Sequence, residues 1–285
     1  METIDPNEPE IVKPKLDIVF KKLMIENKNV LRGFLSDILD NPRNDMGEIA
    51  LMNTEVIPGE LDGKESRLDL KLNVDGKIVN IEVQINDKGN FPERVLYYWA
   101  NMYSDEVKRG TEYEEAKKTT CIDIVDFRLF KDSDDAFSKF QMLETNRHEL
   151  LTDKCAIYFL ELPKAQNKFP ESERKKLWIQ FFNAETKEEL DMLEKTNVPE
   201  IKEAVTVISR MSEDDIMREQ ARRREKILRD AQAELNFAKK QGRAEGRAEG
   251  RAEGEAIGAT KERDRIISQM RLNGLTDEQI AQYIK

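Results

Sequence analysis

The clearest pattern along the chain is an alternation of apolar and polar residues on both sides of the pair Asp75-Gly76. Residues 67–74 and 77–85 alternate with a period of two, which is typical of strands that have one face on a core. An Asp-Gly pair between two such runs indicates a hairpin with a two-residue turn. On one face of this hairpin we expect the core residues Leu68, Leu70, Leu72, Ile81, Val83 and Ile85. The other face carries the polar residues Arg67, Asp69, Lys71, Asn80, Glu82 and Gln84.

Helical and strand-like periods alternate through the next part of the chain. Apolar residues recur at helical spacing over 15–40, and a break near 27–29 predicts two helices. The run 91–109 predicts a third helix, with Pro92 in its first turn and Gly110 just past its end. Further strands are expected at 49–57, 119–130, 139–144 and 154–162, and further helices between 171 and about 210. This order predicts an α/β domain, residues 1–210, built on a mixed sheet.

Residues 211–285 form a charged tail in which glycine recurs at every fourth position of GRAEGRAEGRAEGEAIG. Glycine costs a helix about 1 kcal/mol per residue, so this segment could be a flexible linker. Four residues advance about 400° along an α-helix, so the glycines could instead form a smooth ridge flanked by rows of arginine and glutamate. We expect the helical form, in which two copies associate along the ridge to give a homo-oligomer.

The end of the tail carries a second helix signal. Gly274 fits the position after a helix, and Thr276 with Gln279 fits a capping box that starts another helix. A terminal helical hairpin follows. Its second helix is not basic, which argues against a DNA-binding helix-turn-helix. The most basic run of the tail, Arg222 to Arg224, is either a solvated helix face or a set of phosphate contacts.

Composition limits the chemistry. The net charge of −10 argues against a basic nucleic-acid coat, and one histidine with two separated cysteines cannot build a typical zinc site. No nucleophile-elbow pattern accompanies His148, so a serine hydrolase is not indicated. Cys121 and Cys155 are expected to be buried thiols. The acidic N-terminus is not a signal peptide and no apolar run approaches the roughly 18 residues of a membrane span, so we expect a cytoplasmic protein without membrane contact.

The hairpin poses a chemical question, because counting outward from its turn places Asp69 opposite Glu82. Facing residues have Cβ atoms about 4.5–5.5 Å apart, and like charges at that distance destabilise a sheet. Arg67, which faces Gln84, and Lys71 could neutralise the two acids, or one acid could stay protonated. A divalent cation could also lie between them. The plain alternative is a solvated polar face crossed by salt bridges.

The same residues carry a family resemblance. An aspartate on one strand and Glu-x-Gln on the next, here Asp69 and Glu82 to Gln84, resemble the core of PD-(D/E)XK nucleases, with Gln84 at the place of the motif lysine. More narrowly, a series of segments in this order resembles the recombination-promoting nuclease/putative transposase family. The segments are KLDIVFKKL at 15–23, RLDLKL at 67–72, IEVQI at 81–85, RVLYYWANMYSDEVKRG at 94–110 and the GRAEG tail.

This resemblance implies a restriction-endonuclease-like α/β core in a bacterial protein linked to DNA recombination. The implied activity is a Mg²⁺-dependent DNA endonuclease of low sequence specificity, with Mn²⁺ as a second candidate ion. Carried over to this sequence, Asp69 and Glu82 are the metal ligands and Val83 offers a backbone carbonyl. Gln84 stands in the catalytic motif, and Asp17 matches the early acidic position of the family.

With Gln84 at the place of the motif lysine, another residue would have to supply the positive charge of the site. Glutamine forms hydrogen bonds but carries no charge and takes up no proton. Lys71, Arg67 or Arg94 could supply the charge, and Arg94 and Tyr98 share a helix face that could reach the scissile phosphate. An alternative function is a catalytically inactive, nuclease-like DNA-binding or assembly protein. A strand-transferring transposase is a weaker alternative, since the sequence shows no end-recognition domain.

Overall fold

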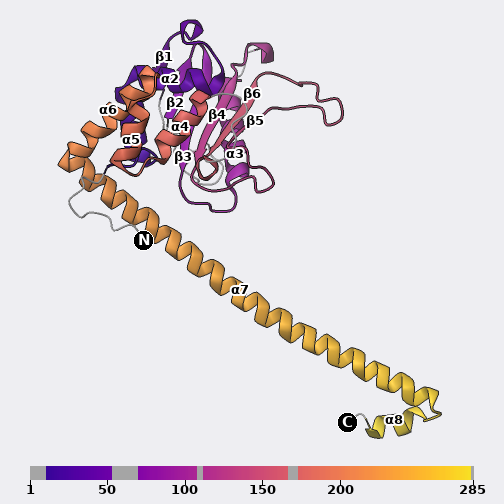
Figure 1. Cartoon of the computed structure of the whole chain (residues 1–285). Coiled ribbons are helices and arrows are strands. Elements are labelled where there is room, and N and C mark those ends of the chain that lie inside the picture. The colour runs from indigo at the N-terminus through magenta and orange to yellow at the C-terminus, as the bar shows by residue number, and fades with distance from the viewer. Residues whose placement is uncertain (1–10, 53–69, 108–111, 166–172, 284–285) are drawn as a thin grey trace. The chain divides into compact units, whose positions relative to one another are not determined.

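A mixed sheet organises the first part of the chain (Figure 1). The computed structural model describes residues 11–52, 70–107, 112–165 and 173–283. Within these residues the sheet has six strands in the order β1-β2-β3-β4-β6-β5. The strands are β1 (Ile49–Leu51), β2 (Leu70–Val74), β3 (Lys77–Gln84), β4 (Thr119–Val125), β5 (Phe137–Phe140) and β6 (Cys155–Glu161). Strands β3, β4 and β6 are parallel and the other neighbours are antiparallel, which confirms the predicted mixed sheet.

The predicted hairpin is confirmed where the structure describes it. Asp75 and Gly76 have φ values of 51° and 77°, the left-handed backbone that a two-residue turn of this kind requires. Leu70 pairs with Ile81 and Val74 with Lys77, as predicted. The predicted pairing of Asp69 with Glu82, and that of Arg67 with Gln84, lie outside the described residues.

The helices follow the predicted order. They are α1 (Asp17–Glu26), α2 (Lys28–Leu39), α3 (Phe91–Glu106), α4 (Glu173–Asn183), α5 (Lys187–Glu194), α6 (Pro199–Glu213), α7 (Asp215–Leu272) and α8 (Asp277–Tyr283), with short 3₁₀ turns at Arg43–Asp45, Tyr113–Glu115 and Leu162–Lys164. The predicted break in the first helical run falls at Asn27. Its backbone and side-chain N–H groups both donate to the carbonyl of Leu23, at 3.2 and 2.9 Å, and so end α1.

Both faces of the sheet are covered. One face packs on a large apolar cluster from α1, α2, α4, α5 and α6, whereas α3 covers the other face with Phe91, Val95, Trp99 and Met102. The polar side chains of β3 lie on the α3 side, where Asn80 and Glu82 are buried. At Asn80 and Glu82 this polar face is therefore not solvated, whereas Lys71 and Gln84 keep part of their surface in solvent. The reason is topological, because β3 and β4 are parallel and their connection must cross over the sheet as a helix.

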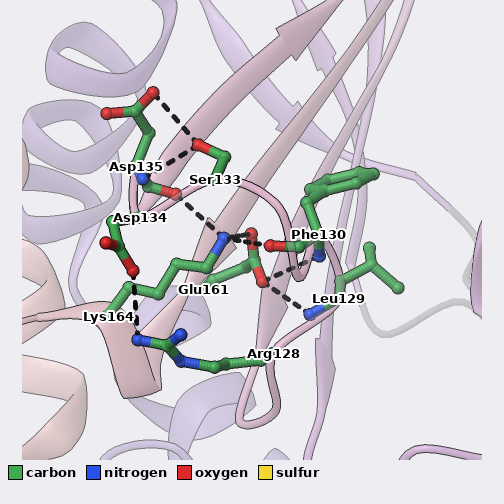
Figure 2. A network of polar contacts seen from close by, with 8 residues as sticks. All are labelled: Arg128, Leu129, Phe130, Ser133, Asp134, Asp135, Glu161 and Lys164. Carbon is green, nitrogen blue, oxygen red and sulfur yellow. Dashed lines mark hydrogen bonds and ion pairs between the residues drawn. The ribbon is translucent and has the colours of Figure 1, made fainter.

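The strand predicted over 119–130 is wrong beyond Val125. After β4 the chain leaves the sheet, and the backbone N–H groups of Leu129 and Phe130 donate to one carboxylate oxygen of Glu161. The other oxygen of Glu161 accepts from Lys164 Nζ at 2.6 Å, and the same amine donates to the carbonyls of Phe130 and Asp135 (Figure 2). A side chain from the end of β6 thus takes the hydrogen bonds that a strand partner would have made.

Two other predicted strands are shorter than expected. Of the predicted strand 139–144, only its first two residues belong to β5, and Leu143 makes an isolated bridge with Leu150. Between them the carboxylate of Glu144 accepts from the backbone N–H groups of Asn146 and Arg147 and holds a turn, in which His148 is exposed. Strand β1 covers the first three residues of the run predicted over 49–57, of which residues 53–57 lie outside the described part.

The chain divides by its internal contacts into two units, residues 1–229 and 230–285. In the second unit the glycine repeat is helical, as predicted, and a Cβ at Gly246 or Gly250 would meet no atom within 4 Å. Gly274 has φ +86°, and the backbone N–H of Thr276 donates to Gln279 Oε1 at 2.9 Å, so the predicted capping box and terminal hairpin are confirmed. Self-association and a functional boundary at residue 210 stay predictions.

No helix in the part of the chain that the structure describes is long and apolar enough to cross a membrane.

Candidate active site

A cavity of about 660 Å³ opens where the C-terminal end of β3 meets α1, α3 and the start of α7. All the residues that line it belong to the first unit. The predicted site residues on its wall are Asp17, Glu82, Val83, Gln84, Arg94 and Tyr98. Another cavity, of about 780 Å³, is lined mainly by residues of α4 and α5 and contains none of these residues. We therefore take the cavity at the end of β3 as the candidate active site.

One guanidinium group joins the two motif residues of β3. Arg94 Nη2 donates to Glu82 Oε1 at 2.9 Å and also to Gln84 Oε1. Gln84 is held at its other end as well, because its Nε2 donates to the carbonyl of Asn86 at 2.8 Å. Arg94 also lies 4.8 Å from the ring centre of Phe91 and 5.9 Å from that of Tyr98, at cation–π distance. Its position is thus set by two acceptors and two rings.

This arrangement places a positive charge beside the residue that replaces the motif lysine. Of the three predicted sources of charge, Arg94 contacts Gln84 directly. Lys71 instead approaches Asp105 at 4.0 Å and does not line the cavity. Arg67 lies outside the described residues, as does the predicted metal ligand Asp69. Within the described residues, the cation in contact with Gln84 therefore comes from α3 and not from the hairpin.

The opposite wall of the cavity comes from the two ends of the first unit. Asp17 stands in the first turn of α1, and its Oδ1 accepts from Arg224 Nε of α7 at 2.8 Å. Lys21, one helical turn after Asp17, lines the cavity too. Sequence reasoning placed Arg224 only in a basic run and missed Lys21, although its spacing of four from Asp17 puts both on one face of α1.

A third acid lies next to Glu82 and was missed. Asp123 of β4 is paired in register with Glu82, and both side chains point to the α3 face and are buried. Burial raises the pKa of the neighbouring Cys121 thiol well above its ordinary value, and the negative charges of Asp123 and Glu82 raise it further. The available signal was one acid inside an apolar strand, CIDIV, which is the same signature that Asp69 and Glu82 show.

The aromatic residues of α3 divide between core and cavity. Trp99 is buried, its ring stacks on Tyr103 with centroids 5.4 Å apart, and its Nε1 donates to the carbonyl of Thr119 at 3.1 Å. Tyr97 is exposed, and Tyr98 lines the cavity. Packing therefore explains Trp99 and Tyr103, while Tyr98 forms part of the cavity wall.

The donor atoms on the cavity wall fit a hard divalent cation. Mg²⁺ usually takes one or two carboxylates and completes its shell with waters and substrate phosphates. Asp17 and Glu82 offer carboxylates, and Val83 lines the cavity beside them. Within the described residues no group of three or more His, Cys, Asp or Glu side chains is arranged to hold an ion. Asp17 and Glu82 thus offer oxygens of the kind that a divalent cation takes, without forming a complete ligand set among the described residues.

Comparison with known proteins agrees with this geometry. The sequence model of a family described as PD-(D/E)XK nuclease family transposase matches residues 14–238, which include α1, the hairpin, α3 and the start of α7. Among curated proteins and among solved structures, none is significantly similar to the chain. The match covers most of the chain and every described element of the cavity, and the six-stranded mixed sheet has the restriction-endonuclease-like fold. This chain belongs to the PD-(D/E)XK nuclease family transposases.

Proposed function

We propose that the protein is a metal-dependent DNA endonuclease that hydrolyses phosphodiester bonds with little sequence specificity. The observation that carries the proposal is the meeting of Glu82, Gln84 and Arg94 in one open cavity. Family membership supports a nuclease-type hydrolase associated with mobile elements and acting on DNA. The cavity offers charged and hydrogen-bonding groups suited to a phosphate, which every DNA sequence carries, and this favours low specificity.

The residues of the cavity divide the work between metal and phosphate. Bound Mg²⁺, or Mn²⁺, would polarise a phosphodiester oxygen and lower the pKa of a water molecule. Glu82 and Asp69 would hold the ion, together with the carbonyl of Val83. Arg94 would offset the charge that develops on the phosphoryl oxygens. Gln84, held at both ends of its amide, would orient Arg94 and donate no proton.

A second function has its own observation in its favour. Arg94 already forms an ion pair with Glu82, and a guanidinium can substitute for a metal ion in neutralising a carboxylate. A protein that had lost the motif lysine and kept this pair could bind DNA or assemble on it without cleaving it. The two functions differ in one result, since only the nuclease cuts DNA when a divalent ion is added.

The first test is cleavage of supercoiled plasmid by the purified full chain. We expect nicked and linear products with Mg²⁺ or Mn²⁺, none with EDTA, and none from Asp69→Asn with either ion. The variant should keep the thermal midpoint of the wild type within a few degrees, so that loss of cleavage is not loss of folding. Intact plasmid with every ion, from folded wild-type protein, would instead support the non-catalytic function.

We also propose that residues 1–210 are the catalytic domain and that the tail, 211–285, joins copies of the chain.

Substituting glycines of the ridge tests whether the tail joins copies of the chain. Gly246→Ala/Gly250→Ala should raise the stability of the helix by roughly 0.5–1 kcal/mol per site, because alanine is the better helix former and meets no obstacle. If copies pack along the ridge, the added methyl groups should nevertheless lower self-association in analytical ultracentrifugation. Ala248→Gly is the control, since it weakens the helix and leaves the ridge intact. An unchanged association constant would count against packing along glycine.

A further inference from the structure

The beginning of α7 is part of the first unit and directs an arginine into the cavity. Met217 and Ala221 are buried in the large apolar cluster, and Leu228 packs against it. Arg224 follows Met217 by seven residues and precedes Leu228 by four, spacings that return to the same side of a helix. The inward side of a helix is normally apolar. Arg224 is therefore a charged residue at a position where packing alone would favour an apolar one.

The surroundings of Arg224 are polar and fixed. Its Nε donates to Asp17 Oδ1 at 2.8 Å, and among the described residues no side chain or carbonyl accepts from the two terminal nitrogens of the guanidinium. The side chain keeps 35% of its surface exposed and lines the cavity. One turn later the carbonyl of Leu228 accepts from Asn86 Nδ2 at 2.9 Å, and Asn86 in turn accepts from Gln84. These bonds hold α7 beside the nuclease motif.

We propose that Arg224 binds a phosphate group of the DNA substrate and that Asp17 positions its guanidinium for this contact. The proposal rests on the proposed function, since it concerns the substrate of the same cavity. A chain with a net charge of −10 repels DNA at long range, so binding requires cations gathered locally. The guanidinium is planar and donates along two edges, so a carboxylate on one edge orients the other edge for two hydrogen bonds to phosphate.

This assignment changes the role of Asp17. The resemblance suggests a place for it near the metal, whereas the structure pairs it with an arginine from the far end of the first unit, 207 residues away in sequence. Glu82 with Asp69 already supplies the two carboxylates that Mg²⁺ usually takes. Asp17 is then a positioning residue that acts through Arg224, and its loss should change DNA binding rather than metal binding.

The first arm of the test measures DNA binding in EDTA, where a metal-dependent enzyme cannot cleave. Fluorescence anisotropy with a duplex at several salt concentrations gives the slope of log K against log [salt], which falls by about 1 for each phosphate contact removed. We expect Arg224→Ala to reduce this slope by about 1 and to weaken binding by about 10- to 100-fold. Arg223→Ala is the matched control: it removes the same charge one residue away, where the side chain pairs with Glu219 at 2.7 Å within the helix. Its slope should stay within a few tenths of the wild type.

The second arm measures cleavage as a function of DNA and of Mg²⁺. Arg224→Ala should raise KM for DNA by about 10- to 100-fold, with Arg224→Lys in between. Asp17→Asn should show a smaller defect of the same kind. The double variant Asp17→Asn/Arg224→Ala should be no worse than Arg224→Ala alone, because Asp17 acts through the arginine. All variants should keep the Mg²⁺ midpoint of the wild type.

Several results would overturn the proposal. These are a wild-type slope and KM in Arg224→Ala, faster cleavage by that variant, or a wild-type chain without salt-dependent DNA binding. A raised Mg²⁺ midpoint in Asp17→Asn would return Asp17 to the metal. The proposed function fails separately: if the wild type never cleaves and yet Arg224→Ala alone reduces the slope, the phosphate contact stands and the nuclease does not.

Discussion

Glu82→Gln should lower Mg²⁺-dependent DNA cleavage by at least about 100-fold. Removing a group that merely supports a metal ligand typically costs about 10- to 100-fold, and Glu82 is assigned as a ligand itself. The substitution keeps the shape of the side chain and an oxygen that can accept from Arg94, at 2.9 Å in the wild type. It removes the negative charge and exchanges the second carboxylate oxygen for an NH2 group. The measurement is the initial rate of plasmid nicking at saturating Mg²⁺.

The control for this variant is the neighbour of Arg94 on α3. Glu93 is exposed and does not line the cavity, so Glu93→Gln should cleave at the wild-type rate. Glu82→Gln should lose little stability although it loses activity, because exchanging a charge-assisted hydrogen bond for a neutral one costs only about 1 kcal/mol. If Glu82→Gln nicked plasmid at a near-normal rate, the assignment of Glu82 as a metal ligand would be wrong. The assignment of this cavity as the active site would then lose its support.

Lys164→Met should destabilise the first unit by about 3–5 kcal/mol, the usual cost of leaving one member of a buried ion pair without its partner. Lys164 and Glu161 are both fully buried, and the amine also bonds two backbone carbonyls (Figure 2). Methionine fills similar space but leaves Glu161 with its charge and without the cation. The measurement is the free energy of unfolding from urea denaturation, followed through the fluorescence of the two buried tryptophans, Trp99 and Trp178.

Two further variants identify the cause. Lys131→Met changes an exposed lysine of the same loop and should alter stability by no more than about 0.5 kcal/mol. Glu161→Gln/Lys164→Met removes both charges and keeps an acceptor for the backbone N–H groups of Leu129 and Phe130, so it should be more stable than Lys164→Met alone. If the double variant is instead the less stable one, the cost comes from lost packing and hydrogen bonds rather than from the isolated charge.

Much of the motif could be predicted because its determinants are local. The positive φ values that Asp75-Gly76 adopt set a two-residue turn, and the turn sets which residues of β2 and β3 face each other. Alternation then assigns each side chain of β3 to a face, so Glu82 and Gln84 had to share one. The helical form of the glycine repeat and the capping box of Thr276 are local in the same sense.

Prediction failed where a distant side chain decides the backbone. The apolar run 119–130 has the composition of one long strand, but Glu161 binds the amides of Leu129 and Phe130 and takes them out of the sheet. The hydrophobic period of the run gives no sign of this contact, because Glu161 lies about 30 residues further along the chain. Likewise, the polar alternation of β3 suggests exposure to water, and only the crossover helix α3 shows that this face is covered.

The sequence by itself determined the hairpin that carries Glu82 and Gln84 and the order of helices around it, and it identified carboxylates as the candidate metal ligands. Composition and periodicity suffice for these, because they act through neighbours a few residues apart. Only the tertiary structure decided which charges lie at the motif. Arg94 contacts Glu82 and Gln84 from α3, Arg224 reaches Asp17 from across the first unit, and Asp123 stands beside Glu82 on a parallel strand. A charge acts through space over a few ångströms whatever its distance along the chain, so its partner is known only once the fold has brought the two together.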